Sequence, residues 1–119
     1  MFCWTTIHVS NLEESIRFYR DIVGLKVTTR YQANEQIKIA FLGEGETLLE
    51  LLYDASAGKS HVGDSISLGF KTDSLEKKIK FLAEHHIPLQ SNPVWPNEHL
   101  GFFYVYDPDG VRVQFVENR

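Results

Sequence analysis

The sequence predicts an α+β protein made of two βαβββ modules. One observation is that the chain repeats itself: residues 11–18 read NLEESIRF and residues 74–81 read SLEKKIKF, an offset of 63 residues. The other is that a strand-like segment precedes each of these helix-like repeats and three strand-like segments follow it. Self-similarity at a fixed offset is typical of a duplicated supersecondary unit. We therefore predict a single domain over residues 1–119, with modules at about 1–54 and 65–119 and a linker at 55–64.

Each module begins its helix at a capping signal. Ser10 with Glu13, and Asp73 with Glu76, have capping-box spacing, in which the first side chain accepts from an amide of the first turn and the glutamate reaches back. Apolar residues at helical spacing follow in both modules: Leu12, Ile16 and Tyr19, then Leu75, Ile79 and Leu82. The expected helix ends are Gly24 in the first module and His85–His86, before Pro88, in the second.

One strand precedes each expected helix and three follow it, because β-branched and aromatic residues are common in these segments. The expected strands are residues 2–9, 25–32, 36–42 and 47–53, then 65–72, 88–90, 101–106 and 111–117. The sequence DPDG at 107–110 predicts a tight turn, since Pro presets φ and Gly tolerates a positive φ. A helix covers only one face of each curved sheet, so we expect the two modules to pair into one domain.

Composition excludes several classes of function. The chain has 119 residues, 43% of them hydrophobic and 24% charged, with a formal net charge of −4. Nucleic-acid binding depends on Lys and Arg neutralising phosphates, so this acidic balance disfavours it. No apolar run approaches the ~20 residues that span a bilayer, so no membrane partner is expected. The first residues lack the features of a signal peptide, and Cys3 is the one cysteine. A reducing, cytoplasmic location is therefore expected.

Three motifs resemble a known family: VSNLEESIRFYRDIVGL at residues 9–25, LEL at 49–51 and DPDG at 107–110. With the two-fold spacing, they resemble the vicinal-oxygen-chelate superfamily, which includes glyoxalase I, extradiol dioxygenases and bleomycin-resistance proteins. The resemblance covers essentially the whole chain. It implies the glyoxalase/bleomycin-resistance fold, with two modules forming a curved mixed sheet around a cleft. It also implies a homodimer.

The same resemblance identifies where a metal would bind. Relatives that act as glyoxalase I hold one divalent metal through four ligands, typically His and Glu in each half. The corresponding positions here are Trp4, Glu50, Ser67 and Gln114. Only Glu50 is a usual ligand, because Trp offers no lone pair and Ser and Gln are weak ligands. His8 lies about 13 Å along the strand from Trp4, which is too far to replace a ligand at position 4 without remodelling. A metal site completed by His8 or by His99 is the alternative. We predict no metal and no other cofactor.

Strand alternation, combined with the resemblance, predicts which residues face the cleft. The cleft set is Phe2, Trp4, Thr6, His8, Leu48, Glu50, Leu52, Ser65, Ser67, Lys71, Arg112, Gln114 and Val116. The core set is Ile7, Val9, Leu49, Leu51, Ile66, Leu68, Phe70, Val113 and Phe115. Aromatic walls with a few polar groups are typical of a small-molecule site. The predicted ligand-binding residues are Trp4, Thr6, His8, Glu50, Ser67, Arg112 and Gln114.

Several roles stay open at this point. Glu50 could act as a general base, or could be a family remnant that hydrogen-bonds Gln114, Ser67 or the Trp4 indole. Trp4 could stack on a ligand or fill the former metal position. Arg112 could pair with an anionic ligand or form a salt bridge with Glu50.

The loop at residues 92–100 could cover one mouth of the cleft with Trp95. The faces taken by Tyr104 and Tyr106 are left open, since the strand register is not fixed by the sequence.

Three functions are compatible with these features. The leading prediction is a small-molecule binder with a metal-free cleft, similar to bleomycin-resistance proteins. The alternative is a lyase or isomerase of the lactoylglutathione-lyase type, with Glu50 as its catalytic residue in a non-standard site. A non-catalytic regulatory partner is the third.

Overall fold

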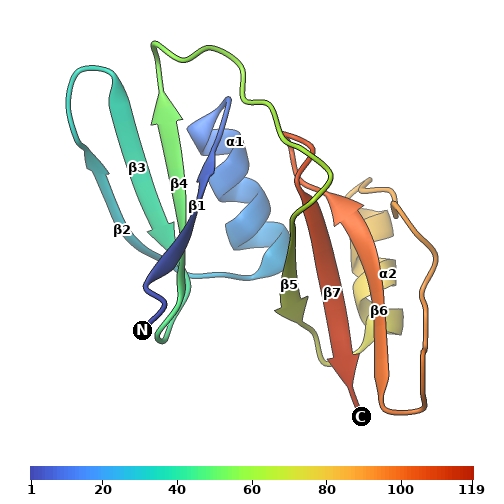
Figure 1. Ribbon diagram of the computed structural model, residues 1–119. Helices are drawn as coiled ribbons and strands as arrows, with labels where there is room; N and C mark the ends of the chain where they lie inside the picture. Colours follow the sequence, from blue (N-terminus) through green and yellow to red (C-terminus); the bar gives the residue numbers. More distant parts are fainter. The chain divides into compact units, whose positions relative to one another are not determined.

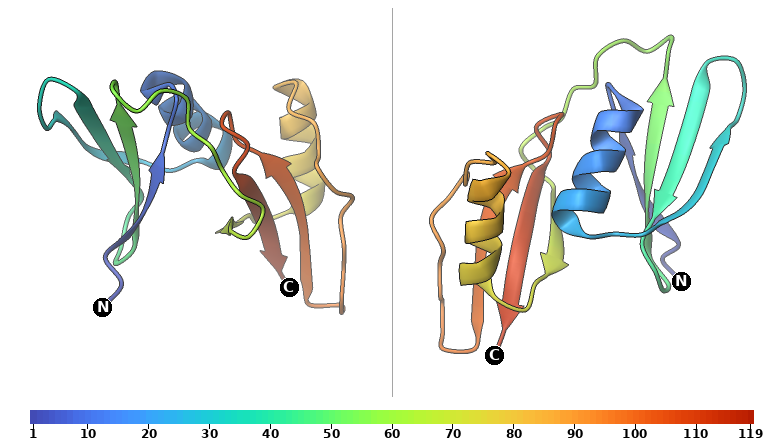
Figure 2. Two further views of the ribbon diagram at one scale, coloured as in Figure 1. Left: turned by 45° about the horizontal axis from the view of Figure 1, so that its top comes forward. Right: turned by 180° about the vertical axis from the view of Figure 1, so that it is seen from behind.

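The computed structural model describes all 119 residues, which form two compact units, Met1–His61 and Val62–Arg119. The boundary between them falls inside the linker predicted at residues 55–64. Each unit contains one mixed sheet and one α-helix (Figure 1), which confirms the predicted α+β class. The views in Figure 2 show the helix of each unit against one face of its own sheet. Neither helix has the length and apolar character needed to cross a membrane.

The first unit has the predicted βαβββ order. Its elements are β1 (Trp4–His8), α1 (Leu12–Arg17), the π-helix η1 (Phe18–Val23), β2 (Val27–Gln32), β3 (Ile37–Leu42) and β4 (Leu48–Asp54). The sheet order is β1-β4-β3-β2, with β1 parallel to β4 and the other pairs antiparallel. The helical segment ends at Gly24, whose φ of 95° is the left-handed conformation that glycine adopts without strain.

The second unit departs from the predicted order. Its elements are β5 (Ser67–Lys71), α2 (Leu75–Glu84), β6 (Leu100–Tyr106) and β7 (Arg112–Asn118), in the sheet order β5-β7-β6. The strand predicted at residues 88–90 is absent, so this unit is βαββ. This stretch is joined to β6 by the Gln90 N–H, which donates to the Tyr104 carbonyl, and by the Ser91 hydroxyl, which accepts from the Tyr104 amide. An isolated bridge between Val94 and Phe102 is the remaining backbone connection. Prolines at 88 and 93 carry no N–H, which prevents a continuous ladder.

Both predicted helix caps are wrong by one residue. Asn11, not Ser10, accepts from the Glu14 amide at the start of α1. In the same way Ser74, not Asp73, accepts from the Lys77 amide at the start of α2. Each helix therefore starts one residue later than the capping-box spacing indicated, and an equally good cap residue sits at that later position.

The helix-facing side of each sheet forms the core. Leu49 and Leu51 of the first unit and Val113 and Phe115 of the second are buried, as predicted. Ile66 is wrong, because it precedes the start of β5 at Ser67 and is 66% exposed. Each buried core side chain of the size of Leu51 or Phe115 contributes about 1.5–3 kcal/mol to the stability of the fold.

The predicted turn at residues 107–110 is present. The buried Asp107 carboxylate accepts from the Asp109 and Val111 amides, both at 2.8 Å, and Gly110 has a φ of 89°. This turn sets the register in which Tyr104 lies opposite Gln114 and Tyr106 opposite Arg112.

Candidate functional site

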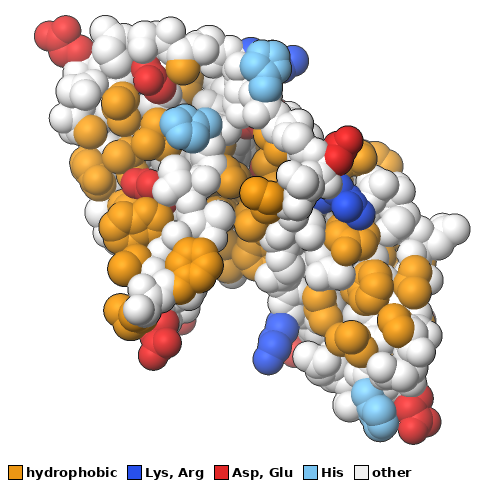
Figure 3. Space-filling view, in the orientation of Figure 1, with side chains coloured by type: hydrophobic (Ala, Val, Ile, Leu, Met, Phe, Trp, Pro, Cys, Tyr) orange, Lys and Arg blue, Asp and Glu red, His pale blue; other side chains and the backbone are white.

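The face of each sheet that its own helix leaves uncovered carries the predicted site residues. We call these surfaces the first open face and the second open face. Figure 3 shows hydrophobic side chains gathered over the sheet of each unit. The first open face comprises Trp4, Thr6 and His8 of β1, Leu48, Glu50 and Leu52 of β4, Ile39 and Phe41 of β3, and Tyr31 of β2.

Glu50 lies at the centre of the first open face. The register places Thr6 on one side of it and Phe41 on the other. Its side chain is buried, with 8% of the residue exposed, and its Oε1 accepts a hydrogen bond of 2.5 Å from the Thr6 hydroxyl. The expected partners of Glu50 were Gln114, Ser67 and the Trp4 indole. Thr6 was missed in this role, although a parallel register of β1 against β4 would have identified it.

Trp4 forms the aromatic part of this face. It is 47% exposed, and the centroids of its ring and the Phe41 ring are 5.1 Å apart, at an interplanar angle of 70°. Edge-to-face pairs of this kind are favourable and orient both rings. The Trp4 ring is therefore held by Phe41 while about half of the residue stays open to solvent or to a ligand.

His8 lies on the same face, opposite Leu52, and is exposed. Its backbone carbonyl accepts from the Ser60 hydroxyl at 2.7 Å, which fastens the segment after β4 to the end of β1. The structure thus brings Trp4, Thr6, His8 and Glu50 onto one surface.

The second open face consists of three rows of residues across the strands β5, β7 and β6. The rows are Ser67, Arg112 and Tyr106; Gly69, Gln114 and Tyr104; and Lys71, Val116 and Phe102. The predicted site residues Ser67, Arg112 and Gln114 thus share this surface. It also answers the open question about the two tyrosines, since both lie on it.

Tyr104 contacts three other residues of the second open face. The Arg112 guanidinium carbon lies over its ring, 4.2 Å from the centroid. The Gln114 side-chain amide donates to the Tyr104 hydroxyl at 3.1 Å. The Phe102 ring packs edge-to-face against the Tyr104 ring. A Cβ on Gly69 would come within 3.2 Å of Gln114 Oε1, so glycine leaves room for that amide.

The residues at the four family metal positions do not fit a metal. Trp4 offers no lone pair, and Ser67 and Gln114 are neutral. Glu50 Oε1 accepts from Thr6, and the Gln114 side-chain nitrogen donates to Tyr104. In neither unit do three or more His, Cys, Asp or Glu side chains gather into a group that could hold a metal ion.

The loop at residues 92–100 lies elsewhere than predicted. The Trp95 ring packs on the backbone of Gly101, and the Arg119 guanidinium covers it at 4.1 Å from the centroid. A hollow of about 370 Å³ here is lined by Ser74, Leu75, Glu76, Ile79, Pro93, Trp95, Glu117 and Arg119. Trp95 therefore lies beside the start of α2, on the helix side of β6, because Gly101 offers it a flat surface there.

Glu117 closes that hollow from β7. Its carboxylate accepts from the Leu75 amide at 2.7 Å, at the start of α2, and from the Arg119 guanidinium at 2.7 Å. These two bonds hold the pKa of Glu117 below its ordinary value. Glu117 thus satisfies an amide that the helix itself cannot.

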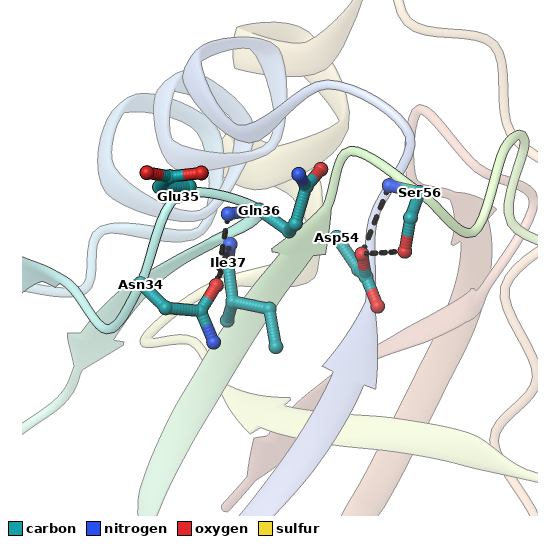
Figure 4. A pocket seen from close by; sticks show the side chains of 6 residues that line it. All are labelled: Asn34, Glu35, Gln36, Ile37, Asp54 and Ser56. Carbon is teal, nitrogen blue, oxygen red and sulfur yellow. Dashed lines mark hydrogen bonds between the residues drawn. The ribbon is translucent and has the colours of Figure 1, made fainter.

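A second hollow, of about 470 Å³, lies at one end of the first sheet (Figure 4). It is lined by Asn34, Glu35, Gln36, Ile37, Asp54 and Ser56. Its polar groups mostly serve the turns. Asn34 Oδ1 accepts from the Gln36 and Ile37 amides, and Asp54 Oδ1 accepts from the Ser56 amide and hydroxyl, which lowers the pKa of Asp54.

Known proteins of one superfamily are similar to this chain over nearly its whole length. Residues 2–115 match the family model of the Glyoxalase/Bleomycin resistance protein/Dioxygenase superfamily. The chain is 28% identical to a lactoylglutathione lyase of Haemophilus influenzae, over 97% of this chain and 90% of that protein. It is 32% identical to the uncharacterized protein YwbC of Bacillus subtilis, over 95% of this chain and 94% of that protein.

Solved structures share the fold. The trypanothione-dependent glyoxalase I of Leishmania major aligns with a TM-score of 0.85 at 23% identity, covering 98% of this chain and 86% of that one. A glyoxalase family protein from Bacillus cereus aligns with a TM-score of 0.83 at 16% identity, covering 99% of this chain and 93% of that one.

Proposed function

Because the chain belongs to the Glyoxalase/Bleomycin resistance protein/Dioxygenase superfamily, we propose that it binds a small molecule on its open sheet faces without a metal. The observation that carries this proposal is the content of the four family metal positions. They hold an indole, a hydroxyl and an amide beside the single carboxylate of Glu50, which already accepts from Thr6.

The chemistry of the first open face supports binding. Trp4 offers an exposed aromatic surface, and Glu50 provides a carboxylate whose Oε2 accepts no hydrogen bond within the first unit. An aromatic wall beside one oriented polar group is the usual composition of a ligand site. Stacking on Trp4 would contribute about 0.5–1.5 kcal/mol beyond the area buried.

The second candidate function is a glyoxalase-like lyase or isomerase, of the kind that the name lactoylglutathione lyase describes in the relatives. A buried carboxylate at a family metal position favours it, since Glu50 Oε2 is free to accept a substrate proton. The Thr6 hydroxyl would then orient the carboxylate.

A thermal-shift screen of small molecules tests the first proposal. A ligand held on the first open face should raise the unfolding temperature of the wild-type protein and should lose most of that effect in Trp4→Ala, because stabilisation follows ligand affinity. Ile66→Ala is the matched control, since it also removes an exposed apolar side chain. Hits that stabilise Trp4→Ala as much as the wild type would refute a site on this face.

An activity assay separates the enzyme alternative. Lactoylglutathione-lyase turnover that disappears in Glu50→Gln, yet persists in the exposed control Glu46→Gln, would favour it. Equal turnover in the two variants would count against Glu50 as a base. So would the absence of turnover in the wild-type protein.

A further inference from the structure

The two open faces differ in charge. The second open face holds the cations Arg112 and Lys71 and no carboxylate in any of its three rows. The first open face, by contrast, has the carboxylate of Glu50 at its centre. The chain has a net charge of −4, so the sign of the charge on this surface, with two cations and no acid, is opposite to that of the whole chain. A positively charged surface attracts anions.

Arg112 occupies the centre of one row with its donors free. It forms no ion pair within its own unit, and its N–H groups donate to no acceptor there. Its guanidinium carbon lies over the Tyr104 ring, and the Gln114 amide anchors that ring through its hydroxyl. A guanidinium held over an aromatic ring is oriented in advance, so less side-chain freedom is lost when it pairs with a ligand.

The neighbours of Arg112 indicate the rest of the ligand. Ser67 lies directly opposite on β5 and carries a hydroxyl, while Tyr106 lies directly opposite on β6 and is 49% exposed. Arg recognises carboxylates through two parallel hydrogen bonds. An exposed tyrosine ring beside it suits a flat apolar group. The row therefore combines a carboxylate partner and an aromatic surface at adjacent positions.

We propose that the second open face binds a small aromatic carboxylate, with the carboxylate on Arg112 and the ring against Tyr106. This inference rests on the proposed function, whose ligand class it narrows from any small molecule to an anionic, ring-bearing one.

The test is a titration of the full chain with benzoate, followed by amide chemical shifts in two-dimensional NMR spectra. Benzamide, a neutral molecule of the same shape, is titrated in parallel. Benzoate should shift the amides of Ser67, Arg112 and Tyr106, and benzamide should bind roughly tenfold more weakly. Arg112→Gln should weaken benzoate binding by a similar factor, whereas Arg17→Gln, an exposed arginine on α1, should leave it unchanged.

The variant Arg112→Lys tests whether benzoate binding depends on the planar guanidinium as well as on its charge. It keeps the charge but loses the planar fork, so benzoate affinity should fall between those of the wild type and Arg112→Gln. The amide spectrum of each variant shows whether its fold is retained. If a variant does not fold, the benzoate-to-benzamide ratio on the wild type decides alone.

The results separate the two proposals. Equal binding of benzoate and benzamide, benzoate shifts outside the second open face, or no benzoate binding would each overturn the aromatic-carboxylate inference. If Trp4-dependent ligands are still found in the thermal-shift screen, the proposed function survives that result. If no small molecule binds at all, both proposals fail.

Discussion

Gly101 is the position where one added methyl group should do the most damage. A Cβ built there would lie 2.5 Å from Trp95 Cδ2 and Cε2 and 2.6 Å from Cζ2, whereas ordinary contact begins at 3.4 Å. The indole ring must therefore move by about 1 Å, and overpacking of this kind typically costs about 1–3 kcal/mol. Trp95 also contacts the Arg119 guanidinium, a contact that contributes about 0.5–1 kcal/mol. We expect Gly101→Ala to lower the free energy of unfolding by about 2 kcal/mol.

Urea unfolding followed by circular dichroism measures this loss. Gly63→Ala is the matched control, because no atom lies within 4 Å of its added Cβ and its φ is not in the left-handed region. In a Trp95→Ala background the clash is gone, so adding Gly101→Ala should be neutral or stabilising by up to about 1 kcal/mol. A Gly101→Ala protein whose free energy of unfolding lies within about 0.5 kcal/mol of the wild-type value would refute the packing of Trp95 on Gly101.

Two further predictions concern the start of α2. In Glu117→Gln the loss of stability should be greatest near neutral pH and should shrink as the pH falls. The reason is that the folded-state pKa lies below the ordinary 4.5, so the charged group stabilises the fold above 4.5 and loses this effect as pH falls through the folded value. Urea unfolding across that range checks this, and a pH-independent difference would contradict it. Ser74→Ala should cost about 1 kcal/mol, as for other N-caps, while Asp73→Ala should be nearly neutral; the reverse order in the same assay would restore Asp73 as the cap.

Repetition and alternation made most of the fold predictable. The repeat between residues 11–18 and 74–81 correctly located both helices, and alternation correctly placed Leu49, Leu51, Val113 and Phe115 in the core. Gly24 was identifiable because glycine is the natural residue for a left-handed helix end. These features depend on local sequence, which a single chain displays directly.

Other features depend on contacts between distant residues. The strand predicted at 88–90 is absent because Pro88 begins the stretch and Pro93 follows it, and only a few bonds to β6 remain. The Thr6–Glu50 bond requires the parallel register of β1 and β4, which the sequence does not reveal. Trp95 lies on the helix side because of the flat backbone at Gly101. The roles of Trp4, His8, Ser67 and the other site residues in binding stay predictions, as does the homodimer.

Metal content tests the central claim most directly. The protein would be purified without a polyhistidine tag from cells grown with added divalent metals, and then analysed for its elements. Because Trp4, Ser67 and Gln114 stand beside Glu50 at the family metal positions, we predict far less than one metal ion per chain. One equivalent of nickel, zinc, iron or manganese would contradict the metal-independent account, and it would mean that other side chains, such as His8 or His99, complete a metal site.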